Sequence, residues 1–270
     1  MISADSDKFS WWLDLKHGGM LISPAVLEEL FPMGYREPSR WEYTVLRDQY
    51  LKFDKWHHDN NRRGNEPLYN WLGIIFDKFL KYPHSHWLKG NQISSDYTVI
   101  TVLKESIRPN WLYFRNKDDE KPTLALMVDT APRLGYGKSR KNYGKLLEYL
   151  RGQNIRLGIF TNGRQIRLCY AGLDHDSWVE WDVSNWFSES EFLPQLYGFY
   201  TLLGQDGLES RDKLEFPLLQ AIEDSRTRQG ELSSVLGEQV RKSLEILLNE
   251  FSRTRQKHPD FTDIVRKNPD

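Results

Sequence analysis

The sequence lacks the features that mark secreted and membrane proteins. It holds one cysteine, Cys169, which cannot form an internal disulfide. No apolar run reaches the roughly 18 residues that a membrane-spanning helix needs. The first residues, MISADSDKFSWWLDL, contain no basic stretch followed by an apolar core, which a secretory signal would have. We therefore expect a cytoplasmic chain without a membrane partner.

Aromatic residues are too abundant for a disordered chain. They make up 13% of the 270 residues, and ten of them are tryptophan. With 39% hydrophobic and 28% charged residues, the composition suits one large globular domain or a domain with an attached helical module. Five tryptophans are expected in the core rather than as platforms for stacked bases: Trp11, Trp12, Trp178, Trp181 and Trp186.

The net charge is only −1, so the chain is not a polycation that attracts nucleic acid along its whole length. Its distribution is uneven. Residues 131–170 hold nine Lys or Arg and one acid, a net of +8, whereas residues 171–224 hold two bases and twelve acids, a net of −10. A basic block this dense is expected where a phosphate backbone is bound. The alternative is two solvated faces that attract each other across the fold.

Hydrophobic periodicity predicts helices on both sides of a group of strands. Apolar residues recur at helical spacing in 40–53 and 67–82, and 139–151 is predicted to be a helix that ends at Gly152. Strands are predicted at residues 97–104, 111–114, 123–128, 155–161 and 165–171. A strand, a helix and a further strand imply a parallel crossover. We therefore predict an α/β fold with a mixed β-sheet flanked by helices.

Three regions are expected along the chain. Residues 1–65 indicate a mostly helical N-terminal lobe, 66–190 an α/β domain, and 191–270 a helical connector. One helix of the connector is predicted to be amphipathic, with apolar residues Val235, Val240, Leu244, Leu247, Leu248 and Phe251.

A hairpin predicted around the polar turn RNKDDEKP (115–122) would bring the residues of a candidate site together. With the turn centred near Asp119 and Glu120, we expect Asn110 to lie opposite Asp129, and Ala131 to point the same way as Asp129. Magnesium-dependent cleavage of a phosphodiester needs hard oxygen ligands for the metal and a lysine that positions water or stabilises charge. Positions 110, 129 and 131 are where such groups would gather.

Several segments resemble a known nuclease family. RPN (108–110), VDTAP (128–132), the basic helix and LGIFTNGRQIRLCYAG (157–172) are similar to the restriction-endonuclease-like, PD-(D/E)xK domain of type IIG restriction–modification enzymes and type I restriction motor subunits. The similarity covers residues 66–187, and TNGR is its most recognisable part. Residues 192–255 are similar to the connector that leads, in type IIG enzymes and related phage-defence methyltransferases, into an adenine methyltransferase domain. The resemblance implies double-stranded DNA, a methyltransferase domain or other defence-system subunits as partners.

The motif departs from the family pattern at the site itself. Where the family has Asp after Pro, this chain has Asn110, and where the family has Lys, it has Ala131; Asp129 alone matches. Losing a ligand charge and the lysine should each lower the cleavage rate by roughly 10²-fold or more. We expect a degenerate, inactive nuclease site, whether natural or engineered, with Mg²⁺ as cofactor only if the site is active.

The basic helix is the candidate DNA-binding element. Lys138, Arg140, Lys141 and Lys145 follow a short glycine loop, and Lys138, Lys141 and Lys145 recur at spacings of three and four along one side. Such a stripe can follow a phosphate backbone without reading bases. The glycine loop either lets the backbone pass close to DNA or makes a turn.

Two alternative functions remain open. One is an active Mg²⁺-dependent endonuclease that tolerates Asn110 and uses a relocated lysine, Lys138 or Lys141; the other is a protein-interaction scaffold within a defence complex. Glu66 or Asp77 could supply a further metal ligand beside the hairpin, in addition to Asp129. With one cysteine and no suitable histidine spacing, the sequence predicts no zinc site.

Overall fold

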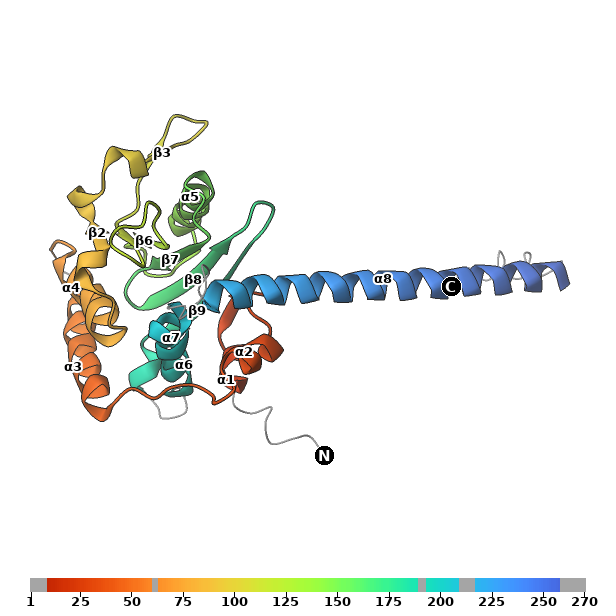
Figure 1. Ribbon diagram of the computed structural model, residues 1–270, viewed down its shortest axis with the longest axis horizontal. Coiled ribbons are helices and arrows are strands. Elements are labelled where there is room, and N and C mark those ends of the chain that lie inside the picture. Colours follow the sequence, from red (N-terminus) through yellow and green to blue (C-terminus); the bar gives the residue numbers. More distant parts are fainter. Residues whose placement is uncertain (1–8, 60–62, 189–192, 209–216, 258–270) are drawn as a thin grey trace. The chain divides into compact units, whose positions relative to one another are not determined.

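The computed structural model describes residues 9–59, 63–188, 193–208 and 217–257 (Figure 1). Contacts divide the chain into two compact units, Met1–Ser225 and Arg226–Asp270. The first unit runs across residues 65 and 190, where the sequence predicted boundaries. No helix in the described ranges is long and apolar enough to cross a membrane.

A seven-stranded mixed sheet organises the first unit, in the order β1-β9-β8-β7-β6-β5-β2. Its strands are β1 (Lys16–Gly18), β2 (Trp87–Lys89), β5 (Trp111–Tyr113), β6 (Leu124–Val128), β7 (Leu157–Thr161), β8 (Gln165–Ala171) and β9 (Asp176–Asp182). Strands β6 and β7 pair in parallel, and the other neighbours are antiparallel. The crossover between β6 and β7 contains α5 (Lys138–Gly152). The predicted mixed α/β fold with a parallel crossover is confirmed.

Strand residues alternate between two hydrophobic cores, one on each face of the sheet. In β6, Leu124 and Leu126 belong to the larger core, whereas Ala125 and Met127 belong to the smaller one. Helix α5 covers the smaller core, on the opposite side of the sheet from α1 and α6 (Figure 1). The larger core is covered by α1 (Ser10–Leu13), α2 (Pro24–Leu30), α3 (Arg40–His57), α4 (Glu66–Gly73), the π-helix η1 (Ile74–Phe79), α6 (Leu193–Leu203) and α7 (Gln205–Leu208).

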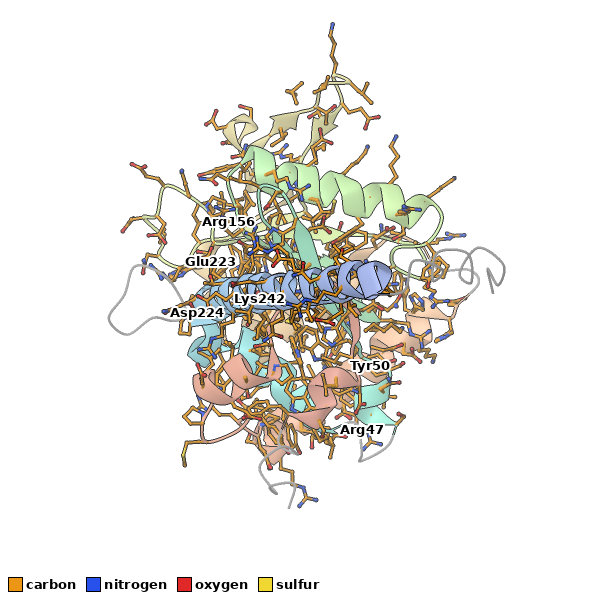
Figure 2. The ribbon with its side chains drawn as sticks, turned by 90° about the vertical axis from the view of Figure 1, so that its right-hand side faces the viewer. Arg47, Tyr50, Arg156, Glu223, Asp224 and Lys242 are labelled. Carbon is orange, nitrogen blue, oxygen red and sulfur yellow. The ribbon has the colours of Figure 1, made fainter. Side chains whose placement is uncertain are left out.

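Aromatic side chains fill much of the larger core. Of the five tryptophans expected there, four are buried and Trp178 is partly buried, against the smaller core. Helix α3 begins with a capping box, in which Ser39 and Glu42 each accept a hydrogen bond from the other's backbone amide. From this helix, Tyr50 (Figure 2) stacks on Phe187 with ring centroids 4.9 Å apart. The N-terminal helices are therefore packed on the sheet rather than held apart from it.

The prediction of one strand at residues 97–104 is wrong. In its place lie two-residue strands, β3 (Val99–Ile100) and β4 (Ser106–Ile107), which pair only with each other. The neighbour of β5 in the large sheet is β2, which the sequence pattern did not predict. Alternating β-branched residues predict a half-buried strand, but here Ile100 and Val102 are 64% and 98% exposed.

The predicted hairpin register is wrong by two residues. Leu112 pairs with Ala125, and Tyr113 pairs with Leu124, so Asn110 does not lie opposite Asp129. The turn explains the shift, because the Asp119 carboxylate accepts hydrogen bonds from the Asn116 amide at 2.9 Å and from Asn116 Nδ2 at 3.2 Å. This side-chain turn moves the centre of the hairpin one residue toward the N-terminus.

The second unit contains most of α8 (Pro217–Lys257). The predicted amphipathic pattern is present, but the apolar residues from Leu232 to Phe251 are more than half exposed. The first residues of α8 belong to the first unit, where Leu218 and Ile222 are buried.

Candidate nucleic-acid interface

A glycine loop leads into α5 and shapes the surface beside it. Gly135 and Gly137 have φ angles of 76° and 54°, which side chains with a Cβ rarely adopt. A Cβ on Gly135 would also lie 3.1 Å from the guanidinium of Arg167. The Gly135 amide donates to Ser139 Oγ at 3.1 Å, which ties the loop to the first turn of α5. The loop is therefore a required turn that lets the backbone approach Arg167.

A cleft of about 520 Å³ opens between this loop, β1, β8 and β9. Its charged lining consists of four cations and one carboxylate, a net charge of +3: Lys16, Arg133, Arg140, Arg167 and Glu180. Three aromatic residues complete the walls: Tyr136, Tyr143 and Trp178. A concave surface with this excess of positive charge concentrates anions.

A buried ion pair forms one wall of the cleft. Arg167 donates to Glu180 Oε2 from Nη2 at 2.6 Å and from Nε at 3.1 Å, and both side chains are at most 6% exposed. The guanidinium carbon lies 3.7 Å from the ring centroid of Trp178 and 5.2 Å from that of Tyr143. Glu180 therefore balances the Arg167 charge and fixes its position. The exposed Arg133 and Arg140 are better able to meet an anionic ligand.

The turn after β7 fastens the loop above the cleft to the sheet. Asn162 Nδ2 donates to the Ala131 carbonyl at 2.9 Å, while Asn162 Oδ1 accepts from the Gln165 amide at 2.7 Å. Gln165 Oε1 accepts from the Leu134 amide at 2.9 Å, and its Nε2 donates to Glu180 Oε1 at 2.7 Å. Asn162 of the TNGR segment and the following Gln165 thus position the loop after β6 relative to the buried ion pair.

The basic residues of α5 discussed above, Lys138, Arg140, Lys141 and Lys145, fall into two groups. Lys141 and Lys145 lie 3.3 and 2.8 Å from the two carboxylate oxygens of Glu105, so both point to one side of the helix, as their spacing predicted. Hydrogen bonds from Lys145 and Lys141 hold the pKa of the Glu105 carboxyl below its usual value. Among the residues that the structure describes, Lys138 and Arg140 form no ion pair.

Among the residues that the structure describes, the acidic block pairs with only part of the basic block. Besides the Arg167–Glu180 pair, Arg151 Nη2 lies 3.5 Å from Asp176 Oδ1 at the C-terminal end of α5. The expected attraction between the two blocks is therefore present over part of this surface. The C-terminal end of α5 contacts the acidic block, whereas the exposed cations at its N-terminal end meet no carboxylate in the described part of the chain.

Asn110, the first position of the motif that resembles the one in nucleases, contacts α4. Its Oδ1 accepts from the Val128 amide at 2.7 Å, and its Nδ2 donates to Tyr69 Oη at 3.0 Å. It lines a cleft of about 620 Å³ together with Asp77 and Lys89. The side chain therefore takes a partner from the helices that cover the larger core.

Asp129, the second position, contacts α5 on the other face of the sheet. Its Oδ1 accepts from the Ala131 amide at 3.0 Å, and its Oδ2 accepts from Asn142 Nδ2 at 3.3 Å. The carboxylate is 5% exposed. Asp129 and Asn110 thus bond to groups on opposite faces, and Ala131 contributes backbone groups to the same turn.

Positions 110, 129 and 131 offer Mg²⁺ a single carboxylate, that of Asp129, at the low end of the one or two carboxylates that usually hold this ion together with water. Each Asp129 oxygen accepts one hydrogen bond and keeps a further lone pair, whereas Asn110 carries no charge. Glu66 is exposed in the first turn of α4, and Asp77 pairs with Lys89 at 3.0 Å and His84 at 2.9 Å. Within the described ranges, no three His, Cys, Asp or Glu side chains form a group that could hold a metal.

Lys16 and Glu180 line the cleft but were not predicted as site residues. Strands β1 and β9 pair Lys16 with Glu180 directly, although the two residues are far apart in sequence. A three-residue edge strand carries no readable periodicity, so no local signal points to Lys16. Glu180 fell within the acidic block but had no sequence feature that distinguished it from the other acids.

The family resemblance rests on the motifs of this sequence. In comparisons with protein-family models, curated proteins and solved structures, the chain matches none.

Proposed function

We propose that this chain is a restriction-endonuclease-like module of a restriction–modification or phage-defence system, which binds double-stranded DNA and carries a degenerate nuclease site. The supporting observation is a set of exposed cations around the start of α5: Arg133, Lys138 and Arg140, here named the α5 cation cluster. None of the three forms an ion pair with a described residue. Their charges are available to an external anion.

Duplex DNA is the anion that suits this surface. Its charges repeat every ~1.7 Å along the axis, and cations that meet several phosphates release bound counterions. The positive end of the α5 dipole adds to the potential at the cluster. Because contacts to phosphates carry no base information, binding should depend weakly on sequence and strongly on salt.

The proposal also states that the nuclease site does not cleave DNA. Replacement of the ligand at position 110 and of the lysine at position 131 should each remove roughly 10²-fold or more of rate. Asp129 is the one charged side chain among the three motif positions, and it is 5% exposed. The alternative of an active endonuclease needs a relocated catalytic lysine, either Lys138 or Lys141. Because Lys141 pairs with Glu105, Lys138 is the better candidate for that role.

A second candidate function, a protein-interaction scaffold, is supported by α8. Nine large apolar side chains are more than half exposed between Leu232 and Phe251, and exposed apolar stripes of this kind commonly mark interaction sites. This function needs no DNA, so DNA binding separates the two candidates.

The test of the proposal neutralises the α5 cation cluster with the substitutions R133Q, K138Q and R140Q. The matched control removes three charges from α8 with R241Q, K242Q and R253Q. Affinity for two unrelated duplexes of equal length is measured by fluorescence anisotropy. The cluster variant should lose affinity for both duplexes with an unchanged melting temperature, whereas the control should bind like the wild type. Unchanged binding by the cluster variant would refute the assignment.

A further inference from the structure

The turn between β3 and β4 exposes apolar side chains at its tip. Val102 and Leu103 occupy the two central positions, and they are 98% and 83% exposed. Turns usually place Gly, Asn, Asp or Pro there, each for a local backbone reason. Neither local preference nor burial within the first unit accounts for a Val-Leu tip. Together with Ile100, which is 64% exposed, they make a small exposed apolar group, and contiguous exposed apolar surface can mark a binding site.

The hairpin holds this tip firmly. The Lys104 amide donates to the Thr101 carbonyl at 2.9 Å, and the Thr101 amide donates to the Glu105 carbonyl at 2.9 Å. The Glu105 amide also donates to Thr101 Oγ1 at 3.1 Å. Lys104 has a φ of 58°, which completes a tight turn. The two apolar side chains are therefore presented by a closed turn.

The base of the hairpin is anchored to α5. Ile107 is buried in the smaller core, and Val99 packs against Gly152, where a Cβ would lie 2.9 Å from both Val99 methyl carbons. Glu105, next to the turn, binds Lys141 and Lys145. Figure 1 shows the hairpin projecting from the first unit near α5. The tip is thus fixed beside the lysine stripe.

We infer that Val102 and Leu103 form a wedge that enters between base pairs of duplex DNA while the cations of α5 hold the phosphates. The inference rests on the proposed DNA binding and adds a distortion of the duplex to it. Lys104 at the tip and Lys138, Lys141 and Lys145 on α5 give four positive charges, against the two negative charges of Glu105 and of Glu148 on the same side of the helix. This charge around an apolar tip complements a polyanion with an apolar interior of stacked bases.

Wedge insertion has a known physical signature. Apolar side chains that enter a base step partly unstack it and kink the duplex by roughly 20–90°. The free-energy cost of kinking is lowest at flexible pyrimidine–purine steps. The position of the kink should therefore depend mildly on sequence, whereas the affinity should not. Binding through phosphates alone needs no kink.

The test compares V102S/L103S with the control M33S/L173S, which removes two other exposed apolar side chains, 94% and 83% exposed. A duplex labelled at both ends, with one central TA step, reports the kink by energy transfer. Anisotropy reports binding. The wild type and the control should bind and raise the energy transfer. V102S/L103S should bind and keep its melting temperature, but the rise in energy transfer should be lost.

Two outcomes overturn the wedge. If V102S/L103S raises the energy transfer as the wild type does, or if the wild type binds without any rise, the wedge is wrong while DNA binding stands. If the wild type does not bind the duplex, the proposed function fails and the wedge fails with it. Anionic lipid vesicles are run in parallel. Vesicle binding that V102S/L103S alone loses, with no change in the duplex signal, would assign the tip to a membrane surface.

Discussion

Removal of the Glu180 charge should destabilise the first unit strongly. In Glu180→Gln the Arg167 guanidinium stays buried between Trp178 and Tyr143 but loses its counter-charge. Breaking a buried ion pair by removing one partner costs about 3–5 kcal/mol, because a charge is left uncompensated. For a unit of this size, each kcal/mol lowers the melting temperature by about 2–4 °C. We expect a decrease of roughly 6–20 °C in Glu180→Gln.

Two controls separate this effect from surface electrostatics. Lys16 Nζ lies 3.5 Å from Glu180 Oε1 and its side chain is 56% exposed, so Lys16→Gln should change stability by at most about 1 kcal/mol. The double variant Arg167→Met with Glu180→Leu removes both charges and should be more stable than Glu180→Gln. Thermal unfolding is followed by circular dichroism. A melting temperature of Glu180→Gln within 2 °C of the wild type would refute the reasoning, since the threshold lies well below the expected loss.

Two further predictions concern α5 and the nuclease motif. The Glu105 carboxyl should titrate below the usual range of a glutamate, and its midpoint in NMR should rise when both contacting lysines are changed to Gln. Because its folded-state pKa is lowered, the contact contributes stability above the usual pKa of a glutamate, and this is lost as the pH falls through the lowered value; an unchanged midpoint would contradict the contact. Supercoiled plasmid should stay intact with Mg²⁺ or Mn²⁺, and the double substitution N110D/A131K should not restore cleavage, because the side chains at 110 and 129 bond to opposite faces of the sheet. Metal-dependent nicking by that double variant would refute the separation.

Four elements with strong local periodicity were predicted correctly from the sequence, whereas the alternating segment 97–104 was wrongly predicted and strand β9 was missed. Helix α5 and strands β6, β7 and β8 lie close to their predicted bounds, because each has an uninterrupted apolar pattern and a clear turn signal. The parallel crossover followed from their order alone. The burial of most tryptophans also followed from composition.

Two missed strands depend on long-range contacts, and the register error arises in a local turn. Strands β1 and β2 have three residues each, too few for an apolar pattern, and their partners are distant in sequence. The predicted hairpin register assumed a turn centred between Asp119 and Glu120. The side-chain hydrogen bonds of Asp119 to Asn116 were not part of that prediction. That error of two residues also paired Asn110 with Asp129.

The candidate site was predictable only in part. The basic block located the α5 cation cluster, since charge density is visible in the sequence. The sequence did not show which cations are already paired. Glu105 neutralises part of the lysine stripe from a segment predicted as a strand, and Glu180 engages Arg167 across neighbouring strands. These contacts move the expected binding surface toward Arg133, Lys138 and Arg140.

Salt dependence of duplex binding tests the central claim most directly. The affinity of the wild type for one duplex is measured by anisotropy over a range of salt concentrations. If the three members of the α5 cation cluster each meet a phosphate, log affinity should fall against log salt with a slope of about −2.7 or steeper, near 0.9 per contact. In the R133Q/K138Q/R140Q variant the slope should flatten by about that amount. A wild-type slope near zero, or a slope that the variant leaves unchanged, would contradict binding of DNA through the start of α5.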